Sequence, residues 1–282
     1  MVDSGAPRGL GSVDSIISVE DVAREARRLA EQGPTRAELE ALAGDDPVLT
    51  IRDLVAGYGK MEILHGLDLM VGRGQSLCLI GPNGAGKSTV LHSIHGFTTI
   101  TGGVITMDGE DVTRLGSSHK LERGIAYILQ DNSVFPNMTV EENLWMGAYL
   151  MADPAAAKAA AEQVLERYPR LAERRHQRAG VLSGGERRLL EISRALVMGP
   201  EVLLVDEPSI GLEPRFIDMV FEILSSLQHD EGKTIIMVEQ NAKKGLEFAD
   251  IGYVLVDGYV AKAGPGDTLL DDPDVGRLFL GG

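Results

Sequence analysis

The residues from Gly81 to Thr89 carry the clearest chemical signal in the chain. They read Gly-Pro-Asn-Gly-Ala-Gly-Lys-Ser-Thr, which fits the phosphate-binding pattern G-x-x-x-x-G-K-[ST]. The apolar residues 77–80 come directly before this stretch and predict a buried strand, and the residues from Val90 onward predict a helix. The order of strand, glycine-rich loop and helix therefore predicts a site for the phosphates of a nucleotide.

Each residue type in this stretch suits that chemistry. Gly84 and Gly86 allow backbone conformations in which successive N–H groups point at phosphate oxygens, and the helix that follows adds its N-terminal dipole. Lys87 supplies a positive charge near the β- and γ-phosphates, and the Ser88 hydroxyl is placed to bind Mg²⁺. The candidate nucleotide ligands in the loop are Gly81, Pro82, Asn83, Gly84, Ala85, Gly86, Lys87, Ser88 and Thr89.

Two further stretches extend this chemistry. The apolar residues 202–205 end in Asp206 and Glu207, a carboxylate pair that suits a Mg²⁺ ligand followed by a general base for water. Residues 182–186 read Leu-Ser-Gly-Gly-Glu, and a predicted helix follows at once, which predicts a second anion site. Because one ATP already has a phosphate cradle, the second site implies that two copies of the cassette share each nucleotide.

Strands and helices alternate along the part of the chain that holds these motifs. Residues 49–55, 63–71 and 103–109 predict strands before or after the glycine-rich loop, and residues 125–128 predict a short buried strand that ends near Gln130. Beyond residue 200, predicted strands at 202–205 and 234–238 alternate with predicted helices at 214–228 and 241–248. This alternation predicts an α/β core with a largely parallel sheet.

Taken together, these residues resemble the ATP-binding-cassette (ABC) ATPases over about residues 48–282. The resemblance implies a P-loop NTPase fold with a RecA-like parallel-sheet core, an antiparallel β subdomain and a helical signature subdomain at about residues 131–200. We expect the ATPase domain to span 47–282. Residues 1–46 form an N-terminal extension, predicted as a disordered start followed by a short helical hairpin.

The resemblance also implies roles and cofactors. The cofactors are ATP and Mg²⁺, with Tyr58 stacked on adenine and Glu207, Gln240 and Lys87 as catalytic residues. The implied Mg²⁺ ligands are Ser88, Gln130 and Asp206. The implied nucleotide contacts outside the loop are Tyr58, Gln130, Ser183, Gly184, Gly185 and Glu186. Of these, Ser183, Gly184 and Gly185 act on the ATP of the partner subunit. Residues 209–213 correspond to the loop that crosses to that subunit.

One position departs from the pattern of the ABC ATPases. After the strand at 234–238 the family usually has a histidine that contacts the γ-phosphate, and here the chain reads Val238-Glu239-Gln240-Asn241. A glutamine forms hydrogen bonds with a phosphate oxygen but carries no charge. Slower hydrolysis, or more dependence on Glu207, is the expected consequence.

The same four residues resemble the ATPases of branched-chain amino-acid importers (the LivF type) and of related urea and amide importers. Residues 134–144, 208–212 and 278–282 agree with that subgroup. We therefore expect an ATPase subunit that powers uptake through separate permease subunits, as a homodimer or beside a sister ATPase, with a solute-binding protein as an indirect partner. Its expected location is the cytoplasmic face of the cell (inner) membrane, as a peripheral protein.

Other functions remain open from the sequence. Residues 182–188 also resemble the ATPase of lipopolysaccharide export, which keeps an exporter in view. A soluble ABC ATPase that acts as a switch is a further alternative, although such proteins usually carry two cassettes, a long insertion or a basic surface. A clamp that binds nucleotide but barely hydrolyses it is suggested by Gln240 and disfavoured by the intact Asp206-Glu207 pair.

The composition of the chain limits the classes of protein to which it can belong. The 282 residues carry a net charge of −15 and 44% hydrophobic residues, which fits a globular protein and argues against a nucleic-acid-binding protein. The single cysteine, Cys78, lies in a predicted core strand, so no disulfide forms within the chain. No secretory signal and no apolar run of membrane-spanning length is expected, so work at a membrane requires docking onto another chain.

Overall fold

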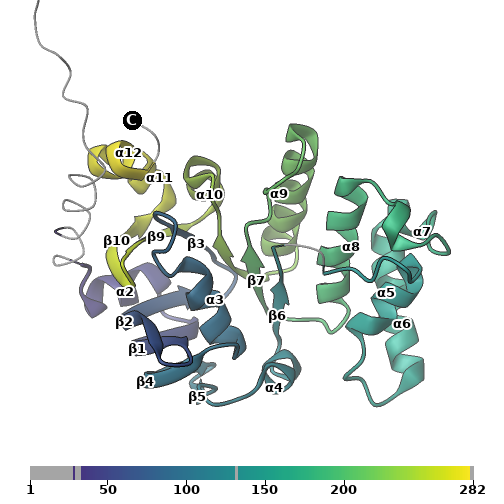
Figure 1. Ribbon diagram of the computed structural model, residues 1–282, viewed down its shortest axis with the longest axis horizontal. Helices are drawn as coiled ribbons and strands as arrows, with labels where there is room; N and C mark the ends of the chain where they lie inside the picture. The colour runs from purple at the N-terminus through teal and green to yellow at the C-terminus, as the bar shows by residue number, and fades with distance from the viewer. Residues whose placement is uncertain (1–27, 29–32, 131–132, 280–282) are drawn as a thin grey trace, which may run out of the picture.

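The computed structural model describes residue 28 and residues 33–130 and 133–279. The expected disordered start and the first helix of the N-terminal hairpin lie outside the described residues, apart from Arg28. The described part holds a six-stranded sheet, a four-stranded sheet and a group of helices set to one side (Figure 1). These parts correspond to the parallel core, the antiparallel β subdomain and the helical subdomain that the sequence predicts.

The six-stranded sheet has the order β10-β9-β3-β8-β7-β6. Neighbours from β9 to β6 pair in parallel, and β10 pairs with β9 as an antiparallel edge hairpin. The strands are β3 Ser76–Ile80, β6 Ile125–Ile128, β7 Val202–Asp206, β8 Thr234–Val238, β9 Ile251–Val256 and β10 Tyr259–Pro265. The parallel core predicted from the sequence is therefore confirmed.

Both faces of this sheet are covered, which explains why its strands read as continuous apolar runs. Along β7, Val202 and Leu204 point into a core shared with the four-stranded sheet, whereas Leu203 and Val205 point into a second core under α9 and α10. The helix α3, Lys87–His95, lies in the first core, and α9, Pro214–His229, and α10, Ala242–Phe248, cover the second.

The four-stranded sheet is antiparallel and has the order β2-β1-β4-β5. Its strands are β1 Pro47–Tyr58, β2 Met61–Gly72, β4 Thr99–Met107 and β5 Glu110–Asp111. The strand predicted at residues 49–55 is longer in the structure: β1 continues through Tyr58 and the chain turns at Gly59 and Lys60, with Gly59 in the left-handed region at φ 60°. The longer strand places Tyr58 at the end of the sheet nearest to α3.

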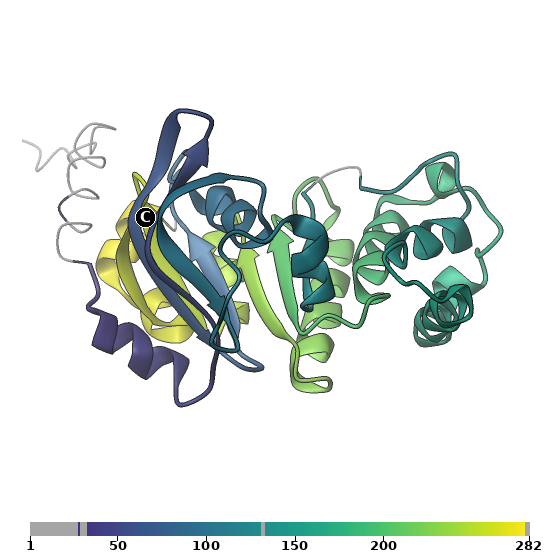
Figure 2. The ribbon, with the colours of Figure 1, turned by 90° about the horizontal axis from the view of Figure 1, so that it is seen from below.

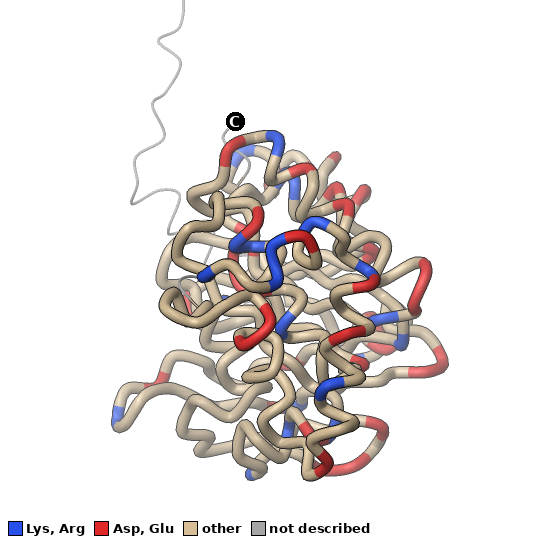
Figure 3. Tube along the Cα trace, turned by 90° about the vertical axis from the view of Figure 1, so that its right-hand side faces the viewer, with Lys and Arg blue, Asp and Glu red and all other residues tan. Residues whose placement is uncertain are grey.

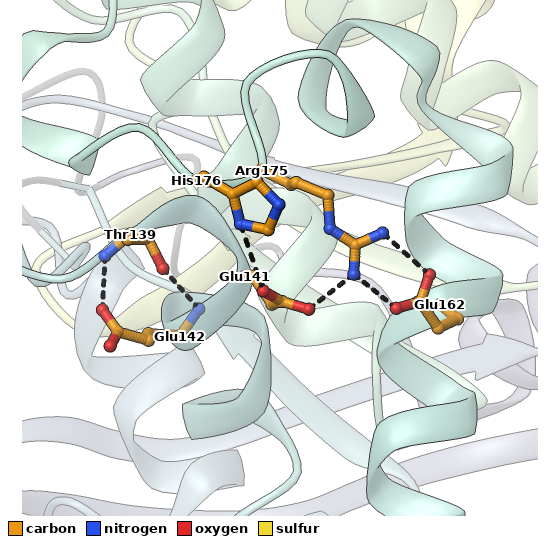
Figure 4. A network of polar contacts seen from close by, with 6 residues as sticks. All are labelled: Thr139, Glu141, Glu142, Glu162, Arg175 and His176. Carbon is orange, nitrogen blue, oxygen red and sulfur yellow. Dashed lines mark hydrogen bonds and ion pairs between the residues drawn. The ribbon is translucent and has the colours of Figure 1, made fainter.

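The helical subdomain lies to one side of the sheets (Figure 2) and has a hydrophobic core of its own. Its helices are α5 Val140–Gly147, α6 Pro154–Arg167, α7 Pro169–Ala172 and α8 Gly184–Leu196. The Arg175 guanidinium joins Glu141 on α5 to Glu162 on α6 at 2.5 Å each, and Thr139 and Glu142 cap the start of α5 (Figure 4). Acidic and basic residues are interspersed along this side of the molecule (Figure 3).

The helix α2, Arg36–Ala43, forms where the second helix of the hairpin is predicted. Thr35 and Glu38 make the predicted capping box, and the side chains of Leu39 and Ala43 are buried in the core with residues of both sheets. A side chain at Gly72 on β2 would lie 2.3 Å from the carbonyl oxygen of Ala43, so this glycine allows the helix to approach closely. The described end of the N-terminal extension thus packs on the cassette.

Besides the four-residue α7, three short helices have no counterpart in the sequence prediction. They are α4 Ser117–Glu122, α11 Gly266–Leu270 and α12 Pro273–Phe279. Each is at most seven residues long, so none spans two full turns of apolar periodicity. No helix among the described residues is long and apolar enough to cross a membrane.

Candidate functional site

The glycine-rich loop connects β3 to α3 with a backbone that other residue types adopt rarely. Gly81, Gly84 and Gly86 have φ angles of 144°, 84° and 97°. A side chain at Gly81 would lie 2.2 Å from the carbonyl oxygen of Leu255, and one at Gly86 would lie 2.8 Å from the Leu64 side chain. Gly86 is the N-cap of α3 and supplies no side-chain cap, so the first amides of the helix stay available for an anion.

The Lys87 side chain folds back over this loop. Its Nζ donates to the carbonyl oxygens of Gly81 and Pro82 at 2.8 and 3.0 Å. Burial lowers the pKa of Lys87, while the nearby carboxylates of Glu207 and Asp206 oppose that shift. The ammonium group therefore lies at the loop where a phosphate chain would enter.

Asp206, at the end of β7, receives a hydroxyl donor on each carboxylate oxygen. Ser88 Oγ donates to Oδ1 at 3.1 Å, and Tyr127 Oη donates to Oδ2 at 2.8 Å. Burial raises the pKa of Tyr127, so its hydroxyl keeps the proton that it donates. The sequence pattern pointed to Ser88 and Asp206 but not to Tyr127, which stands in the predicted strand at 125–128 with no signal except its spacing from Gln130.

Glu207 and Gln130 come together at the same end of the sheet. Gln130 Nε2 donates to Glu207 Oε2 at 3.1 Å, and the backbone N–H of Glu207 donates to the Val238 carbonyl oxygen at 2.9 Å. Glu207 has a φ of 43°, which is uncommon for a residue with a side chain and occurs often at functional sites. The structure thus gathers Lys87, Ser88, Gln130, Asp206 and Glu207 around the ends of β3, β6 and β7.

The Tyr58 ring stands against α3 and is 42% exposed. Its hydroxyl forms a short hydrogen bond with Nδ1 of His92, and the two rings meet edge to face with centroids 6.0 Å apart. His92 was assigned no function from the sequence. The contact places the predicted adenine-stacking tyrosine one helix turn beyond the phosphate loop.

Gln240 is exposed after β8, whereas the preceding Glu239 is buried. Glu239 Oε1 accepts hydrogen bonds from Ser209 Oγ at 2.7 Å and from the Asn241 N–H at 3.0 Å. The loop after Glu207 is therefore tied to the residue beside Gln240. The sequence pattern points to Gln240 and not to Glu239, because the pairing of Glu239 with Ser209 joins positions thirty residues apart.

The Leu-Ser-Gly-Gly-Glu stretch forms the N-terminus of α8. Ser183 and Glu186 make a capping box, and Arg174 Nε lies 2.5 Å from Glu186 Oε1. The hydrogen bonds from the Ser183 backbone and hydroxyl, together with the nearby Arg174 charge, lower the pKa of Glu186. The helix begins at Gly184 rather than at the expected Glu186 because Ser183 caps it.

The Leu-Ser-Gly-Gly-Glu stretch at residues 182–186, called the signature from here on, and the phosphate loop lie in different parts of the molecule. In Figure 1, β6, β7 and α9 separate α8 from α3. No hydrogen bond or ion pair among the described residues joins residues 183–186 to residues 81–89. The two stretches therefore occupy separate places in the part of the chain that the structure describes.

A groove of about 470 Å³ is lined by residues of α3, α4, β6, α5 and α8 and by Leu129, the residue before Gln130 in the chain. Its apolar rim includes Leu129, Phe135, Met146 and Tyr149, which are 37 to 60% exposed. The buried Asn143 fixes this rim, since its amide group donates to the Phe135 carbonyl at 3.0 Å and accepts from the Phe135 N–H at 2.7 Å. Tyr127 and His95 lie on the inner side of the groove.

The donor set suits MgATP. Ser88, Asp206 and Gln130 offer a hydroxyl, a carboxylate and an amide, which are the oxygen ligands that Mg²⁺ prefers together with substrate phosphates. The strained glycine backbone, the uncapped start of α3 and Lys87 suit the phosphate chain. The residues present thus fit both ATP and its metal ion.

The model of the ABC transporter family matches residues 64–210. The chain belongs to the ABC transporter family. It is an ATP-binding subunit of that family, whose members bind and hydrolyse ATP, and its fold class is the one predicted from the sequence. A solved structure of an ATP-binding cassette of an ABC transporter in its ADP conformation superimposes with a TM-score of 0.74 at 27% identity, covering 84% of this chain and 100% of that one.

Among curated relatives, this chain is similar to ATP-binding proteins of amino-acid transport. It is 44% identical over 225 residues to the high-affinity branched-chain amino acid transport ATP-binding protein BraG of Pseudomonas aeruginosa, covering 80% of this chain and 96% of that protein. It is 39% identical to a probable LivF protein of Archaeoglobus fulgidus, covering 81% and 96%. A lipopolysaccharide export ATP-binding protein, LptB of Haemophilus influenzae, is 30% identical, covering 83% and 97%.

Proposed function

We propose that this chain is the ATP-hydrolysing subunit of an importer for branched-chain or other amino acids, or for urea and short amides. The observation that carries the proposal is the joint presence of a phosphate loop, the Asp206-Glu207 pair and a separate signature in one cassette. The similarity to branched-chain amino-acid transport proteins at 44 and 39% identity supports the substrate class.

Hydrolysis follows from the groups at the ends of β3 and β7. The Glu207 carboxylate takes a proton from a water molecule whose oxygen bonds to the γ-phosphorus. The bond between that phosphorus and the β,γ-bridging oxygen breaks, and the products are ADP and phosphate. Mg²⁺, when bound by Ser88, Asp206 and Gln130, supplies neutralisation of the phosphate charge, and Lys87 adds a second positive charge at the loop.

Gln240 supplies a hydrogen bond rather than a charge to the γ-phosphate. Its neighbour Glu239 anchors Ser209, so the position of Gln240 is linked to the loop at residues 209–213. Since a neutral amide stabilises developing negative charge less than a protonated histidine, Glu207 carries more of the catalytic effect here.

Two cassettes act together in this proposal. The residues Ser183, Gly184, Gly185 and Glu186 of one subunit contact the ATP bound at the loop of the other, because a single chain keeps the two sites apart. The partner is an identical chain or a sister ATPase. ATP then closes the pair and hydrolysis opens it again, which drives the membrane subunits.

The groove beside Gln130 is the surface that we assign to the permease. It is lined mostly by apolar and aromatic side chains, with Glu191 and Arg194 among them. It includes Leu129, the chain neighbour of Gln130, and Gln130 contacts Glu207, so a segment seated there can respond to the state of the nucleotide. The chain would then lie at the cytoplasmic face of the membrane as a peripheral subunit, with a solute-binding protein as an indirect partner. No role in nucleic-acid binding is proposed.

The proposal is tested by isolating the intact complex from its native membranes in mild detergent and identifying its subunits by mass spectrometry. We expect polytopic permease subunits, a second ATPase and a solute-binding protein of the amino-acid or amide class. A Tyr149→Asp variant, altered at the groove, should lose the permease but keep ATP binding. Met61→Asp, at a position 67% exposed on β2 and outside the groove, is the matched control.

Two results of that experiment would contradict the proposal. Soluble partners without any membrane protein would favour the soluble switch. Membrane and periplasmic partners of the lipopolysaccharide pathway would favour export, the function named for relatives at 30% identity.

A further inference from the structure

We propose that Tyr127 is a positioning residue that orients Asp206 for Mg²⁺ and connects this carboxylate to the groove beside α8. The inference rests on the proposed function, because it assumes that Asp206 binds the metal ion of MgATP. Tyr127 belongs to none of the motifs from which the site was predicted.

The carboxylate of Asp206 has one hydroxyl donor on each side. Tyr127 Oη holds Oδ2 at 2.8 Å and Ser88 Oγ holds Oδ1 at 3.1 Å. Asp206 is only 4% exposed, so water has little access to replace a lost donor. When Ser88 turns to the metal ion, Tyr127 is the side-chain donor that still fixes the plane of the carboxylate.

Residues that hold a metal ligand in place commonly affect metal binding nearly as much as the ligand itself does. Loss of such a partner typically lowers metal affinity by about 10-fold to 100-fold. A hydrogen bond from a neutral hydroxyl to a carboxylate is also among the stronger ones in proteins. The phenol of Tyr127 therefore has an energetic reason to influence Mg²⁺ binding without touching the ion.

The ring of Tyr127 is fixed by aromatic neighbours on the other side. It stacks on His95 with centroids 5.4 Å apart and an angle of 27°, and it meets Phe97 and His92 edge to face at 5.9 and 5.8 Å. His92 in turn contacts Tyr58, the tyrosine assigned to adenine. This cluster holds the hydroxyl in line with Asp206 and reaches the adenine side of the site.

The same ring borders the groove of about 470 Å³ that we assign to the permease. A segment seated in the groove thus contacts a ring whose hydroxyl holds the metal-binding carboxylate. This gives the groove a route to the nucleotide site that differs from Gln130, because Gln130 reaches Glu207 whereas Tyr127 reaches Asp206.

The test is the Mg²⁺ dependence of nucleotide binding in Tyr127→Phe, which removes one oxygen and keeps the ring. Binding of a fluorescent N-methylanthraniloyl ATP is measured in the full chain over a range of Mg²⁺ concentrations and in EDTA. We expect the Mg²⁺ concentration at half-maximal binding to rise about 10-fold. Binding in EDTA should equal that of the unaltered chain, since no phosphate or adenine contact is changed.

Tyr253→Phe is the matched control. Tyr253 is a buried tyrosine of β9 whose hydroxyl bonds the backbone of Met70, at 3.1 Å to the N–H and 3.2 Å to the carbonyl oxygen, away from the nucleotide site. Its loss should lower the melting temperature and leave the Mg²⁺ dependence unchanged. If the role of Tyr127 were purely structural, Tyr127→Phe would also lower the melting temperature and leave the Mg²⁺ dependence unchanged.

Phe97→Ala provides a second test, because Phe97 is 48% exposed and its replacement leaves the Tyr127 hydroxyl in place. It should raise the Mg²⁺ requirement less than Tyr127→Phe does. An unaltered Mg²⁺ requirement in folded Tyr127→Phe overturns the inference, and if that variant does not fold, an unaltered requirement in Phe97→Ala does. Failure of the unaltered chain to bind ATP in a Mg²⁺-dependent way would instead contradict the proposed function.

Discussion

At the scale of single residues, the contrast between Glu207 and Gln240 governs how fast the chain is expected to work. Glu207 combines a left-handed backbone with a hydrogen bond from Gln130, so its carboxylate is oriented at the end of β7. Gln240 stands exposed after β8 where the family usually has histidine. In the proposed mechanism the site therefore has its base in place and a weaker group at the γ-phosphate position.

Gln240→His should keep or raise the hydrolysis rate, because an imidazole can donate a hydrogen bond and also carry charge. The rate is measured as phosphate release at saturating ATP. Gln163→His, at an exposed position on α6, controls for adding a histidine. Complete loss of activity in Gln240→His would show that the glutamine has a specific role that a histidine does not fill.

His95 makes stability depend on pH. Burial, together with the positive charge of Lys120 and the nearby His92, lowers its pKa to about 4 from 6.5. The unfolded chain binds a proton on this residue below pH 6.5 whereas the folded chain does not, so its contribution is fully present above 6.5 and is lost as the pH falls toward 4. The loss amounts to up to about 3 kcal/mol.

Urea unfolding at pH 7 and at pH 5 checks this expectation. His95→Phe keeps an aromatic ring beside Tyr127 and Phe97 and has no proton to bind. Its free energy of unfolding should fall less between the two pH values than that of the unaltered chain. Equal losses in the two proteins would show that His95 is not the group responsible.

The site residues that could be predicted from the sequence are those that belong to motifs of consecutive residues. Lys87, Ser88, Asp206 and Glu207 each sit in a short motif, and the structure brings them to one end of the sheet. Tyr127 acts through a contact with Asp206, 79 positions away. Such a pairing depends on the neighbouring positions of β6 and β7, which a single sequence does not reveal.

At the scale of elements, the local sequence pattern predicted the buried strands and the longer helices. Buried strands of the parallel sheet read as apolar runs, and the helices α5, α6 and α8 begin at Thr139, Asp153 and Ser183, whose side chains cap them. The order of the strands in the sheet was beyond reach, because it depends on crossover connections rather than on local pattern. The short helices α4, α11 and α12 lack both length and period.

Leu39 tests whether α2 belongs to the cassette. Its side chain is 1% exposed and lies in the core with residues of both sheets. Leu39→Ala should lower the free energy of unfolding by about 2–4 kcal/mol in a single urea transition. Glu40→Ala, exposed on the same helix, should change it little. Equal effects of the two substitutions would instead support a boundary at residue 46 with an independent extension before it.

At the scale of the whole molecule, the separation between α8 and the phosphate loop determines how many chains are needed to complete one nucleotide site. Both parts belong to one chain, yet β6, β7 and α9 lie between α8 and α3 (Figure 1). Two chains that share two nucleotides would bring the phosphate loop of one chain to the signature of the other. The net charge of −15 on each chain opposes their association, so ATP has to supply the attraction that holds the pair together.

The measurement that tests this account most directly is the ATP-dependent mass of Glu207→Gln by light scattering, with turnover measured in parallel. We predict a monomer without nucleotide, a dimer with MgATP, and stalled hydrolysis, because the variant keeps the binding groups and lacks the base. Glu166→Gln, at an exposed position on α6, should hydrolyse ATP as the unaltered chain does. A Glu207→Gln chain that stays monomeric with MgATP and hydrolyses it at the unaltered rate would contradict both the base and the shared site.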